Sequence, residues 1–276
     1  MLILAATPIG NLGDASPRLV EHLKTAKFIA AEDTRMLYKL AQALGIRVEA
    51  KTFSLHEHNE LDRVKQLVAI AATDDLLVVS DAGMPTVSDP GFLLVRGCVA
   101  QGIDVTIVPG PSAVLAALAV SGLPTDRFIF EGFIPRKQGE RQRFWTALAA
   151  DPRTMVFFES PHRILESLQA AAEVLGAHRQ ASVSRELTKK FEQTMRGSLA
   201  QLIEWAKTEP KGEIVMVVAG ASATEVAAVD VVEQVMELLD AGSPLKPAVA
   251  QVATANGVSK SELYELVLQE RKARGK

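Results

Sequence analysis

Short apolar runs alternate with helical segments through the first 120 residues, and this order constrains the fold more than any other feature. The apolar runs lie at residues 2–6, 28–31, 52–55, 76–79 and 105–108. Helices are expected between and after them, at 17–25, 36–44, 61–71, 90–101 and 113–120. A strand–helix–strand order of this kind is typical of a parallel sheet with crossover helices. The sequence therefore predicts an α/β domain over residues 1–120.

The pattern changes after a turn-rich segment at residues 121–126. Strands are expected at 128–133, 154–159, 181–186, 191–197 and 212–218, and helices at 140–149, 163–175 and 199–207. Only Leu187 to Lys190 separates the third of these strands from the fourth, which is too short for a crossover and requires an antiparallel hairpin. We therefore predict a second α/β domain over residues 121–222, with a mixed sheet.

Small residues at 221–224 form a linker to a third region, residues 223–276. Helices are expected there at 227–239, 246–255 and 259–272. The last begins with a Ser259-x-x-Glu262 capping box, after a tight turn at residues 256–258. Two short helices joined by such a turn resemble a helix-turn-helix. Basic residues gather in this tail, so it is either a nucleic-acid contact or a solvated packing appendage.

Composition excludes several classes of protein. The 276 residues are 48% hydrophobic with a net charge of −3, so any nucleic-acid site must be a local patch. Cys98 is the single cysteine, which excludes an internal disulfide and a multi-cysteine zinc site. The N-terminus lacks the basic segment of a signal peptide, and no apolar run approaches the ~20 residues of a membrane span. We expect a soluble, cytoplasmic protein.

Three glycine-rich turns follow strands of the first predicted sheet. They span Thr7 to Gly13, Asp81 to Gly91 and Pro109 to Ala113. Glycine lets a ligand approach the backbone closely, and helix N-termini offer free N–H donors. In the second turn, Asp89 is expected to cap a helix that begins at Pro90. Each turn alone could be an ordinary connection, but three at one sheet edge predict a ligand cleft.

The motifs leave the ligand of this cleft open. Gly10-x-x-Gly13 with Glu32 is half of a dinucleotide-binding fingerprint, and a phosphate-binding P-loop motif is absent. His56-Glu-His58 with Glu60 could ligate a metal, contact a substrate or form a polar rim, but no third histidine is nearby. Metal binding is the least favoured of these three interpretations.

Two further clusters could carry chemistry in the second domain. Glu159-Ser-Pro-His-Arg163 joins a carboxylate, an imidazole and a guanidinium, as in a proton-handling or phosphate-binding corner, or it is a capped helix start. A nucleophile elbow for a serine hydrolase is absent. Residues 135–143 are basic and lie beside Phe133, Phe144 and Trp145, which suits phosphate binding and base stacking. A solvated helix start is the alternative.

A resemblance covers residues 1–220. The chain resembles the bacterial 16S rRNA (cytidine-2'-O)-methyltransferases of the tetrapyrrole methylase superfamily. The motifs that carry it, in order, are Ala6-Thr-Pro-Ile-Gly-Asn-Leu12, Ala31-Glu-Asp-Thr-Arg35, His56-Glu-His-Asn-Glu60, Val79-Ser-Asp-Ala-Gly-Met-Pro85, Val108-Pro-Gly-Pro-Ser-Ala113, Gly122-Leu-Pro-Thr-Asp126, Glu131-Gly-Phe-Ile-Pro-Arg-Lys137, Glu159-Ser-Pro-His-Arg163, Arg185-Glu-Leu-Thr-Lys189 and Lys211-Gly-Glu213. The C-terminal helices resemble the small helix-turn-helix domain of the same family. Met84 departs from the pattern, where the family has threonine.

The resemblance implies a homodimer that binds S-adenosylmethionine between two α/β domains. It implies transfer of the methyl group to a ribose 2'-hydroxyl of a cytidine in the decoding region of 16S rRNA, with the small ribosomal subunit as partner. Its cofactor contacts map onto Pro8, Gly10, Asp81, Ala82, Gly83, Pro85, Ser112, Ala113, Glu186, Leu187, Gly212 and Glu213. We expect no metal cofactor, no DNA partner and no membrane partner.

Two groups of residues remain as candidates for catalysis and for RNA binding. A ribose hydroxyl is a weak nucleophile, so a base or an oxyanion-stabilising group is expected, from among His58, Glu159, His162 and Lys189. The RNA-binding candidates are Arg136, Lys137, Arg141, Arg143, Lys260, Arg271 and Lys272. Two other functions stay open: methylation of a tetrapyrrole-like small molecule, and non-catalytic binding of RNA or the ribosome.

Overall fold

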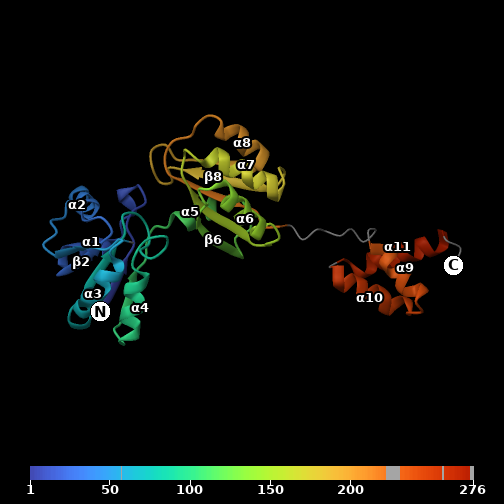
Figure 1. Cartoon of the computed structure of the whole chain (residues 1–276), viewed down its shortest axis with the longest axis horizontal. Coiled ribbons are helices and arrows are strands. Elements are labelled where there is room, and N and C mark those ends of the chain that lie inside the picture. Colours follow the sequence, from blue (N-terminus) through green and yellow to red (C-terminus); the bar gives the residue numbers. More distant parts are fainter. Residues whose placement is uncertain (57, 222–230, 257, 274–276) are drawn as a thin grey trace. The chain divides into compact units, whose positions relative to one another are not determined.

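The computed structural model describes residues 1–56, 58–221, 231–256 and 258–273. The chain forms two compact units, one of Met1–Ala149 and Arg153–Ala219, the other of Ala150–Pro152 and Gly220–Lys276. Figure 1 shows their helices and strands, with labels on many of them. The predicted domain boundary at residues 222–223 lies outside the described residues. Within the described ranges, no helix is both long enough and apolar enough to cross a lipid bilayer.

The first sheet of the larger unit is entirely parallel, as predicted. Its strands are β1 (Leu2–Ala5), β2 (Phe28–Ala31), β3 (Lys51–Ser54), β4 (Leu76–Val79) and β5 (Val105–Val108). Their order is β3-β2-β4-β1-β5, and each neighbouring pair is parallel. The helices between them are α1 (Pro17–Thr25), α2 (Thr34–Ala43), α3 (Glu60–Thr73) and α4 (Phe92–Ala100), and a 3-10 turn, η1, spans Leu12–Asp14.

Alternating strand residues cover this sheet with helices on both faces. On one face Leu4 and Val78 pack with Leu67 of α3 and Leu94 of α4. On the other, Leu77 packs with residues of α1 and α2. The helices α1 and α2 carry the chain outward from β1 to β3, whereas α3 and α4 carry it back to β5. Because the direction of connection reverses, the loops after β1 and β4 lead to helices on opposite faces of the sheet, which makes this a topological switch point. Open α/β sheets bind ligands in a crevice at such a point, and we call this location the switch-point crevice.

Helix starts in this unit are partly as predicted. Ser16 caps α1, since its Oγ accepts the Leu19 N–H at 3.1 Å. The prediction that Asp89 caps a helix from Pro90 was wrong: α4 begins at Phe92 and Gly91, at φ 120°, occupies its N-cap. The cap is supplied by Glu60, whose Oε1 accepts the N–H groups of Gly91 and Leu93, each at 2.9 Å.

The apolar face of α3 differs from the one that helical periodicity predicts. That period places Leu61 on one face with Leu67, Val68 and Ala71, but Leu61 is 80% exposed, whereas Glu60 is buried. The helix starts at Glu60 rather than Leu61, and the Glu60 carboxylate turns inward toward α4. The buried face of the helix is formed by Leu67, Val68 and Ala71, as expected.

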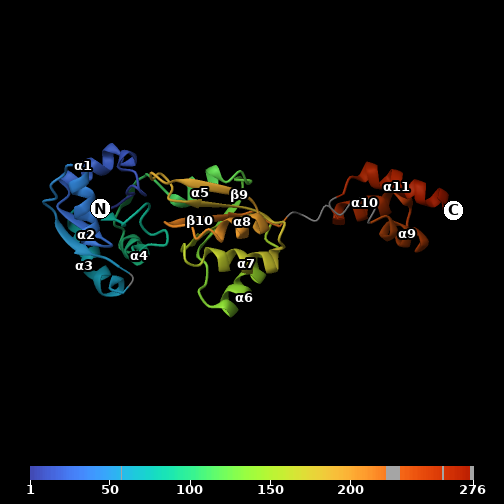
Figure 2. The same cartoon turned by 90° about the horizontal axis from the view of Figure 1, so that it is seen from above.

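The second sheet is mixed, as the hairpin predicted. Its strands are β6 (Phe128–Phe133), β7 (Thr154–Glu159), β8 (Gln180–Arg185), β9 (Gln193–Ser198) and β10 (Ile214–Val218), in the order β6-β7-β10-β8-β9. Only β6 and β7 pair in parallel. The helices α6 (Gln138–Leu148), α7 (Ile164–Leu175) and α8 (Leu199–Ala206) cover one face, where Trp145 and Phe157 are fully buried (Figure 2).

The helix α5 (Ala113–Val120) packs on the opposite face of the second sheet (Figure 2). The predicted first domain ends with this helix, yet Val114, Ala117 and Leu118 lie in one cluster with Val156, Val215 and Val217 of β7 and β10. The same cluster contains Ile9 from the loop after β1 and Leu187 from the β8–β9 hairpin. This apolar contact joins the two sheets into one unit.

In the part that the structure describes, the smaller unit is a bundle of three helices, α9 (Val232–Asp240), α10 (Leu245–Asn256) and α11 (Lys260–Ala273). Its core includes Val235, Met236, Val249, Val252 and Leu263. Of the predicted capping box, the Ser259 side is present, with the Glu262 N–H donating to Ser259 Oγ at 3.4 Å. Residues 227–230 of the first expected helix and Gly257 of the predicted turn lie outside the described residues.

Candidate active site

The loops that leave β1 and β4 are joined at their bases by an isolated antiparallel bridge. The Thr7 N–H donates to the Gly83 carbonyl at 2.8 Å, and the Gly83 N–H donates to the Thr7 carbonyl at 3.1 Å. The buried Thr7 hydroxyl also donates to the Ser80 carbonyl at 3.3 Å. The switch-point crevice therefore has a fixed floor, made of backbone from two loops.

The third glycine turn meets the same floor. Gly83 has φ +87°, and a Cβ there would lie 3.4 Å from Ile9 Cγ2 and 3.7 Å from the Pro111 carbonyl oxygen. At Gly110, a Cβ would lie only 3.0 Å from that of Ala6. The turns after β1, β4 and β5 thus lie close together. Gly110 has little room for a side chain beside Ala6, and the positive φ of Gly83 disfavours one, so backbone forms the cradle at both positions.

The loop after β4 is strained next to this cradle. Thr86 and Ser88 adopt φ values of 75° and 61°, a region that non-glycine residues avoid, and a β-branched threonine most of all. Such strain tends to cluster at ligand sites. A Cβ on Gly132 of β6 would lie 3.6 Å from Ser88 Oγ, so this loop also reaches the second sheet.

Acidic side chains border the cradle. Asp81 Oδ1 accepts the Asp33 N–H at 3.1 Å, and the Asp81 N–H donates to Glu32 Oε2 at 3.3 Å. Burial raises the pKa of Asp81, and the charge of Asp33 adds to the rise. Burial also raises the pKa of Asp89 to about 7, with a further contribution from the charge of Glu32. The carboxylates favour a cationic ligand in this crevice.

The second sheet contributes an ion-pair cluster from the β8–β9 hairpin. Lys189 Nζ lies 3.0 Å from Glu186 Oε1 and 2.9 Å from Glu213 Oε2. The Lys189 stem crosses Gly10, where an added Cβ would overlap Cγ of the lysine. The Glu186 side chain crosses Gly212 in the same way. Gly10 therefore allows the hairpin to lie directly over the loop after β1, and Gly212 allows Glu186 to lie over the segment before β10.

The cluster keeps Lys189 charged. Burial lowers the pKa of Lys189, but hydrogen bonds to Glu213 and Glu186 outweigh burial and leave that pKa raised. The hydrogen bond from Lys189 is the main cause of the lowered pKa of Glu186. Lys189 is therefore an ammonium group at neutral pH, which donates hydrogen bonds and cannot accept a proton.

The predicted cofactor-binding residues gather at this crevice from both sheets. In the first sheet's loops Pro8, Gly83 and Pro85 are buried, whereas Gly10, Asp81 and Ala82 are exposed. Serine commonly caps a helix through its side chain, but Ser112, the N-cap of α5, makes no such hydrogen bond. Ala113 is half-buried beside it. The second sheet brings the exposed Glu213, the half-buried Glu186 and Gly212, and the buried Leu187.

Three predicted catalytic candidates lie in different surroundings. Glu159 is fully engaged, since it accepts the Ser160 N–H at 2.6 Å, accepts the Ser167 hydroxyl and pairs with Arg163. His162 is exposed, with its backbone N–H 3.4 Å from Ser160 Oγ. His58 is also exposed, and its ring centroid lies 6.1 Å from that of His56. Glu159 thus anchors the start of α7.

The basic segment after β6 is only partly at the surface. Arg136, Lys137 and Arg143 are exposed, but Arg141 is buried and pairs with Glu166 at 3.2 Å. Of the aromatic residues expected beside them, Trp145 is in the core, Phe144 packs against it, and Phe133 is 60% exposed. Helical periodicity explains this split, because Arg141 and Trp145 share the inward face of α6.

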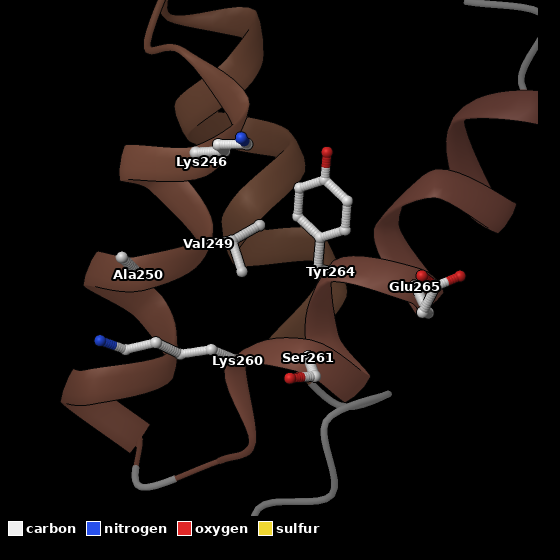
Figure 3. Close-up of a pocket in the computed structure, with 7 residues that line it drawn as sticks. All are labelled: Lys246, Val249, Ala250, Lys260, Ser261, Tyr264 and Glu265. Carbon is white, nitrogen blue, oxygen red and sulfur yellow. The ribbon is translucent and has the colours of Figure 1, made fainter.

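The smaller unit has a groove of about 420 Å³ between α10 and α11. Lys246, Val249 and Ala250 line it from α10, and Lys260, Ser261, Tyr264 and Glu265 from α11. Figure 3 shows the Tyr264 ring beside Val249 and Lys246, whereas Glu265 points away from them. Lys260, a predicted RNA-binding residue, thus lies in a groove with Lys246 and Tyr264. Those two residues were not among the predicted RNA-binding candidates. Arg271 is half-buried and Lys272 exposed, near the end of α11.

Two residues of the larger unit were also missed as site residues. Asp89 was expected only as a helix cap, and Glu60 only as a member of the His56 motif. The sequence signal for Glu60 was its place one residue before an apolar face, and for Asp89 its place just before Pro90 and Gly91 in a turn. Neither signal is specific without the fold, because both depend on contacts between distant elements.

Comparison with known proteins agrees with this geometry. Residues 1–203 match the family model of Tetrapyrrole (Corrin/Porphyrin) Methylases, and residues 225–272 match the RsmI C-terminal HTH domain. The chain is 49% identical to Ribosomal RNA small subunit methyltransferase I of Mycobacterium tuberculosis, over 99% of this chain and 96% of the relative. Against the same-named protein of Pseudomonas aeruginosa the identity is 44%, over 97% and 96%.

Solved structures share the fold at low sequence identity. The methyltransferase CobJ superposes with a TM-score of 0.60 at 20% identity, over 80% of this chain and 94% of CobJ. Diphthine synthase gives 0.59 at 15% identity, over 79% and 89%. The chain therefore belongs to the family of tetrapyrrole (corrin/porphyrin) methylases, with an RsmI-type helix-turn-helix domain at its C-terminal end.

Proposed function

We propose that this methyltransferase transfers the methyl group of S-adenosylmethionine to the ribose 2'-hydroxyl of a cytidine in the decoding region of 16S rRNA. One observation carries the proposal: three backbone loops of the first sheet and the Lys189 hairpin of the second converge on one crevice at the topological switch point. The names of the relatives, which are ribosomal RNA methyltransferases, support an rRNA acceptor.

The residues of the crevice fit S-adenosylmethionine chemically. The Gly83 cradle offers backbone to a ligand at a φ of +87°, which a residue with a side chain would adopt only under strain. The carboxylates of Asp81 and Asp89 suit the positive charges of the sulfonium and the amino group. The charged Lys189 suits a carboxylate. Pro8, Gly10, Ala82, Pro85, Ser112, Ala113, Glu186, Leu187, Gly212 and Glu213 complete the proposed contact set.

When bound, the cofactor supplies an electrophilic methyl group. The protein then has to hold the acceptor oxygen in line at ~3 Å and exclude water. The pairing of Lys189 with Glu186 and Glu213 ties the hairpin to the segment before β10, and the Lys189 stem lies over Gly10, so the cluster positions the second sheet's wall of the crevice. In this arrangement Lys189 stabilises negative charge and does not act as a base.

The hydroxyl proton needs an acceptor. The partners of Glu159 leave it a structural role, and His58 and His162 are free in solvent. Asp89 joins the two histidines as a candidate, because it lies in the strained loop and titrates near neutral pH. We expect the pH profile of methyl transfer to lose its acidic limb in Asp89→Asn if Asp89 is the base. An unchanged profile would leave the histidines.

Two basic surfaces are proposed to bind the RNA. The first consists of the exposed Arg136, Lys137 and Arg143. The second is the groove with Lys246, Lys260 and Tyr264, together with Arg271 and Lys272 of α11. Phosphate contacts of this kind make affinity depend on salt, so charge reversal at Lys260 should weaken subunit binding and reduce its salt dependence. Reversal of the exposed Lys39 on α2 is the matched control.

The test is transfer of labelled methyl groups from S-adenosylmethionine to purified small ribosomal subunits, followed by mapping of 2'-O-methylated nucleotides. The expected result is one labelled cytidine in the decoding region. Label in an added tetrapyrrole and none in the subunit would favour a small-molecule acceptor. Subunit binding without cofactor binding or transfer would favour a non-catalytic RNA-binding protein.

We also propose a homodimer that acts in the cytoplasm, where its acceptor is assembled. Exposed apolar side chains on α4 and the edge strand β5 support the dimer, namely Phe92, Val99 and Ile107. Apolar surface at a sheet edge usually marks an interaction site. Sedimentation equilibrium should give twice the monomer mass, and Ile107→Lys should shift the protein toward monomer.

A further inference from the structure

Three phenylalanines form a cluster on the face of the second sheet that meets the first. The ring centroids of Phe130 and Phe158 lie 4.9 Å apart, and those of Phe133 and Phe158 5.4 Å apart, both in edge-to-face arrangements. Phe130 and Phe158 pack against the apolar cluster that contains Ile9 of the loop after β1. The aromatic cluster therefore borders the switch-point crevice.

Phe133 is the outermost ring of the three, at 60% exposure. A strand places residues three apart on opposite faces, but the register of β6 shifts between Phe130 and Phe133. Gly132, at φ +69°, makes this bulge possible, and its backbone lies against Ser88 of the strained loop. The bulge returns Phe133 to the face of Phe158 and holds an exposed aromatic ring next to the proposed methyl-donor loop.

We propose that Phe133 is the stacking platform for the base of the acceptor nucleotide, with Arg136 and Lys137 on the phosphates beside it. This inference rests on the proposed function. A planar ring fixed edge-on by Phe158 loses little freedom when a flat base stacks on it, and stacking tolerates any base. The exposed guanidinium and ammonium groups follow three and four residues later in the chain, and cations beside a stacked base suit the phosphates of the same strand.

The test compares four variants of the full-length protein. Phe133→Leu and Phe133→Ala remove the planar ring, Phe133→Tyr keeps it, and Phe128→Ala removes a partly exposed phenylalanine from the other end of β6. Methyl transfer to small subunits and equilibrium binding of subunits without cofactor are measured, as is the Kd for S-adenosylmethionine.

Loss of stacking should raise KM and the subunit Kd by about 5-fold to 150-fold in Phe133→Leu and Phe133→Ala. Phe133→Tyr should stay within about threefold of the parent, because it keeps the flat ring. Phe128→Ala should match the parent, and all four variants should bind S-adenosylmethionine normally. Leucine keeps an apolar side chain of similar bulk, so a difference between leucine and tyrosine reports planarity rather than packing.

The outcomes separate this inference from the proposed function. Equal subunit binding by Phe133→Leu and the parent would overturn stacking, whatever the transfer assay gives. A weakened Kd for S-adenosylmethionine in Phe133→Leu would assign the ring to the cofactor and overturn the inference as well. Ring-dependent subunit binding without any methyl transfer by the parent would support stacking and overturn the proposed function alone.

Discussion

The two sheets of the larger unit supply different chemistry to one crevice. The first contributes backbone: the Thr7–Gly83 bridge, the Gly83 cradle and the turn at Gly110. The second contributes side chains: the Lys189 ion-pair cluster and the exposed ring of Phe133. The difference follows from topology, because only the parallel sheet has a switch point, whereas the mixed sheet approaches with the tip of a hairpin.

The largest expected effect comes from a substitution at Gly10, where the loop after β1 touches the Lys189 side chain of the second sheet. Gly10→Ala should reduce methyl transfer by about 100-fold or more, since the new Cβ overlaps the Lys189 stem at a φ of +151° and displaces the hairpin. Transfer to small subunits and binding of S-adenosylmethionine are the measurements.

Gly45→Ala is the control, because Gly45 also has a positive φ but nothing within 4 Å of an added Cβ. It should cost about 1 kcal/mol of stability and no activity. In a Lys189→Ala background, Gly10→Ala should do less damage than in the parent. Full additivity of the two substitutions would show that the hairpin does not depend on Gly10.

The same contrast explains what could be predicted from the sequence. The alternation of apolar runs with helical segments predicted the parallel strands, and the short segment from Leu187 to Lys190 predicted the hairpin. Both signals depend only on the local order of residues along the chain. The start of α4 could not be predicted, since its cap comes from Glu60, 31 residues away. The burial of Arg141 and the exposure of Leu61 depend on which helix face meets a neighbour.

The candidate site was partly predictable for the same reason. Glycines at the ends of strands predicted the cradle. The bulge at Gly132 makes Phe133 an exposed partner of Phe158, but no periodic pattern in the sequence indicates that bulge. Motif resemblance selected Glu186, Lys189 and Glu213 without showing that they form one ion-pair cluster. The roles of residues that depend on contacts between distant segments could be assigned only from the three-dimensional structure.

A second substitution tests the first sheet without touching the hairpin. Glu60→Leu should lower the free energy of unfolding by about 1.5–3 kcal/mol, because an apolar side chain of similar size can no longer accept the Gly91 and Leu93 N–H groups. The loop after β4 should become more susceptible to proteolysis. Asp62→Asn, an exposed carboxylate on the same helix, should change stability by less than about 0.5 kcal/mol. Equal effects of the two would contradict the cap.

A third substitution tests the second sheet's charge cluster. Lys189→Met should weaken binding of S-adenosylmethionine and lower stability by about 1–2 kcal/mol, because Glu186 and Glu213 lose their shared cation. Lys189→Arg keeps the positive charge, so it should retain most of the affinity for S-adenosylmethionine and most of the stability of the parent. Lys207→Met is the control, since Lys207 pairs with Glu204 on the exposed surface of α8 and such pairs contribute little.

The pH dependence of this effect has a definite sign. Lys189 lowers the pKa of Glu186 in the folded protein below its ordinary value of 4.5. The stability that the Lys189–Glu186 pair contributes is therefore fully present above pH 4.5 and is lost as the pH falls through the pKa of Glu186 in the folded protein. The stability difference between the parent and Lys189→Met should be largest at neutral pH and shrink in acid. A constant difference would mean that the effect is steric.

The smallest expected effect comes from Asp89, whose pKa is raised rather than lowered, so its stability contribution depends on pH in the opposite direction to that of Glu186. The folded pKa is about 7, against an ordinary value of 3.8, so the folded protein binds the proton more tightly than the unfolded chain. Stability from protonated Asp89 is complete below about pH 4 and is lost as pH rises to 7. Asp89→Asn should therefore raise stability at pH 8 by about 1 kcal/mol, allowing for solvent screening of a half-buried group, and leave it unchanged at pH 4.

Thermal unfolding of Asp89→Asn at pH 4, 6 and 8 measures this, with the exposed Asp104→Asn as the control. The gain should grow across the series for Asp89 and stay flat for Asp104. A gain of the same size at every pH would mean that the amide relieves local strain between Ser88 and Pro90 rather than a buried charge. In that case the backbone of the first sheet, and not its acidic border, would set the cost of keeping the crevice open.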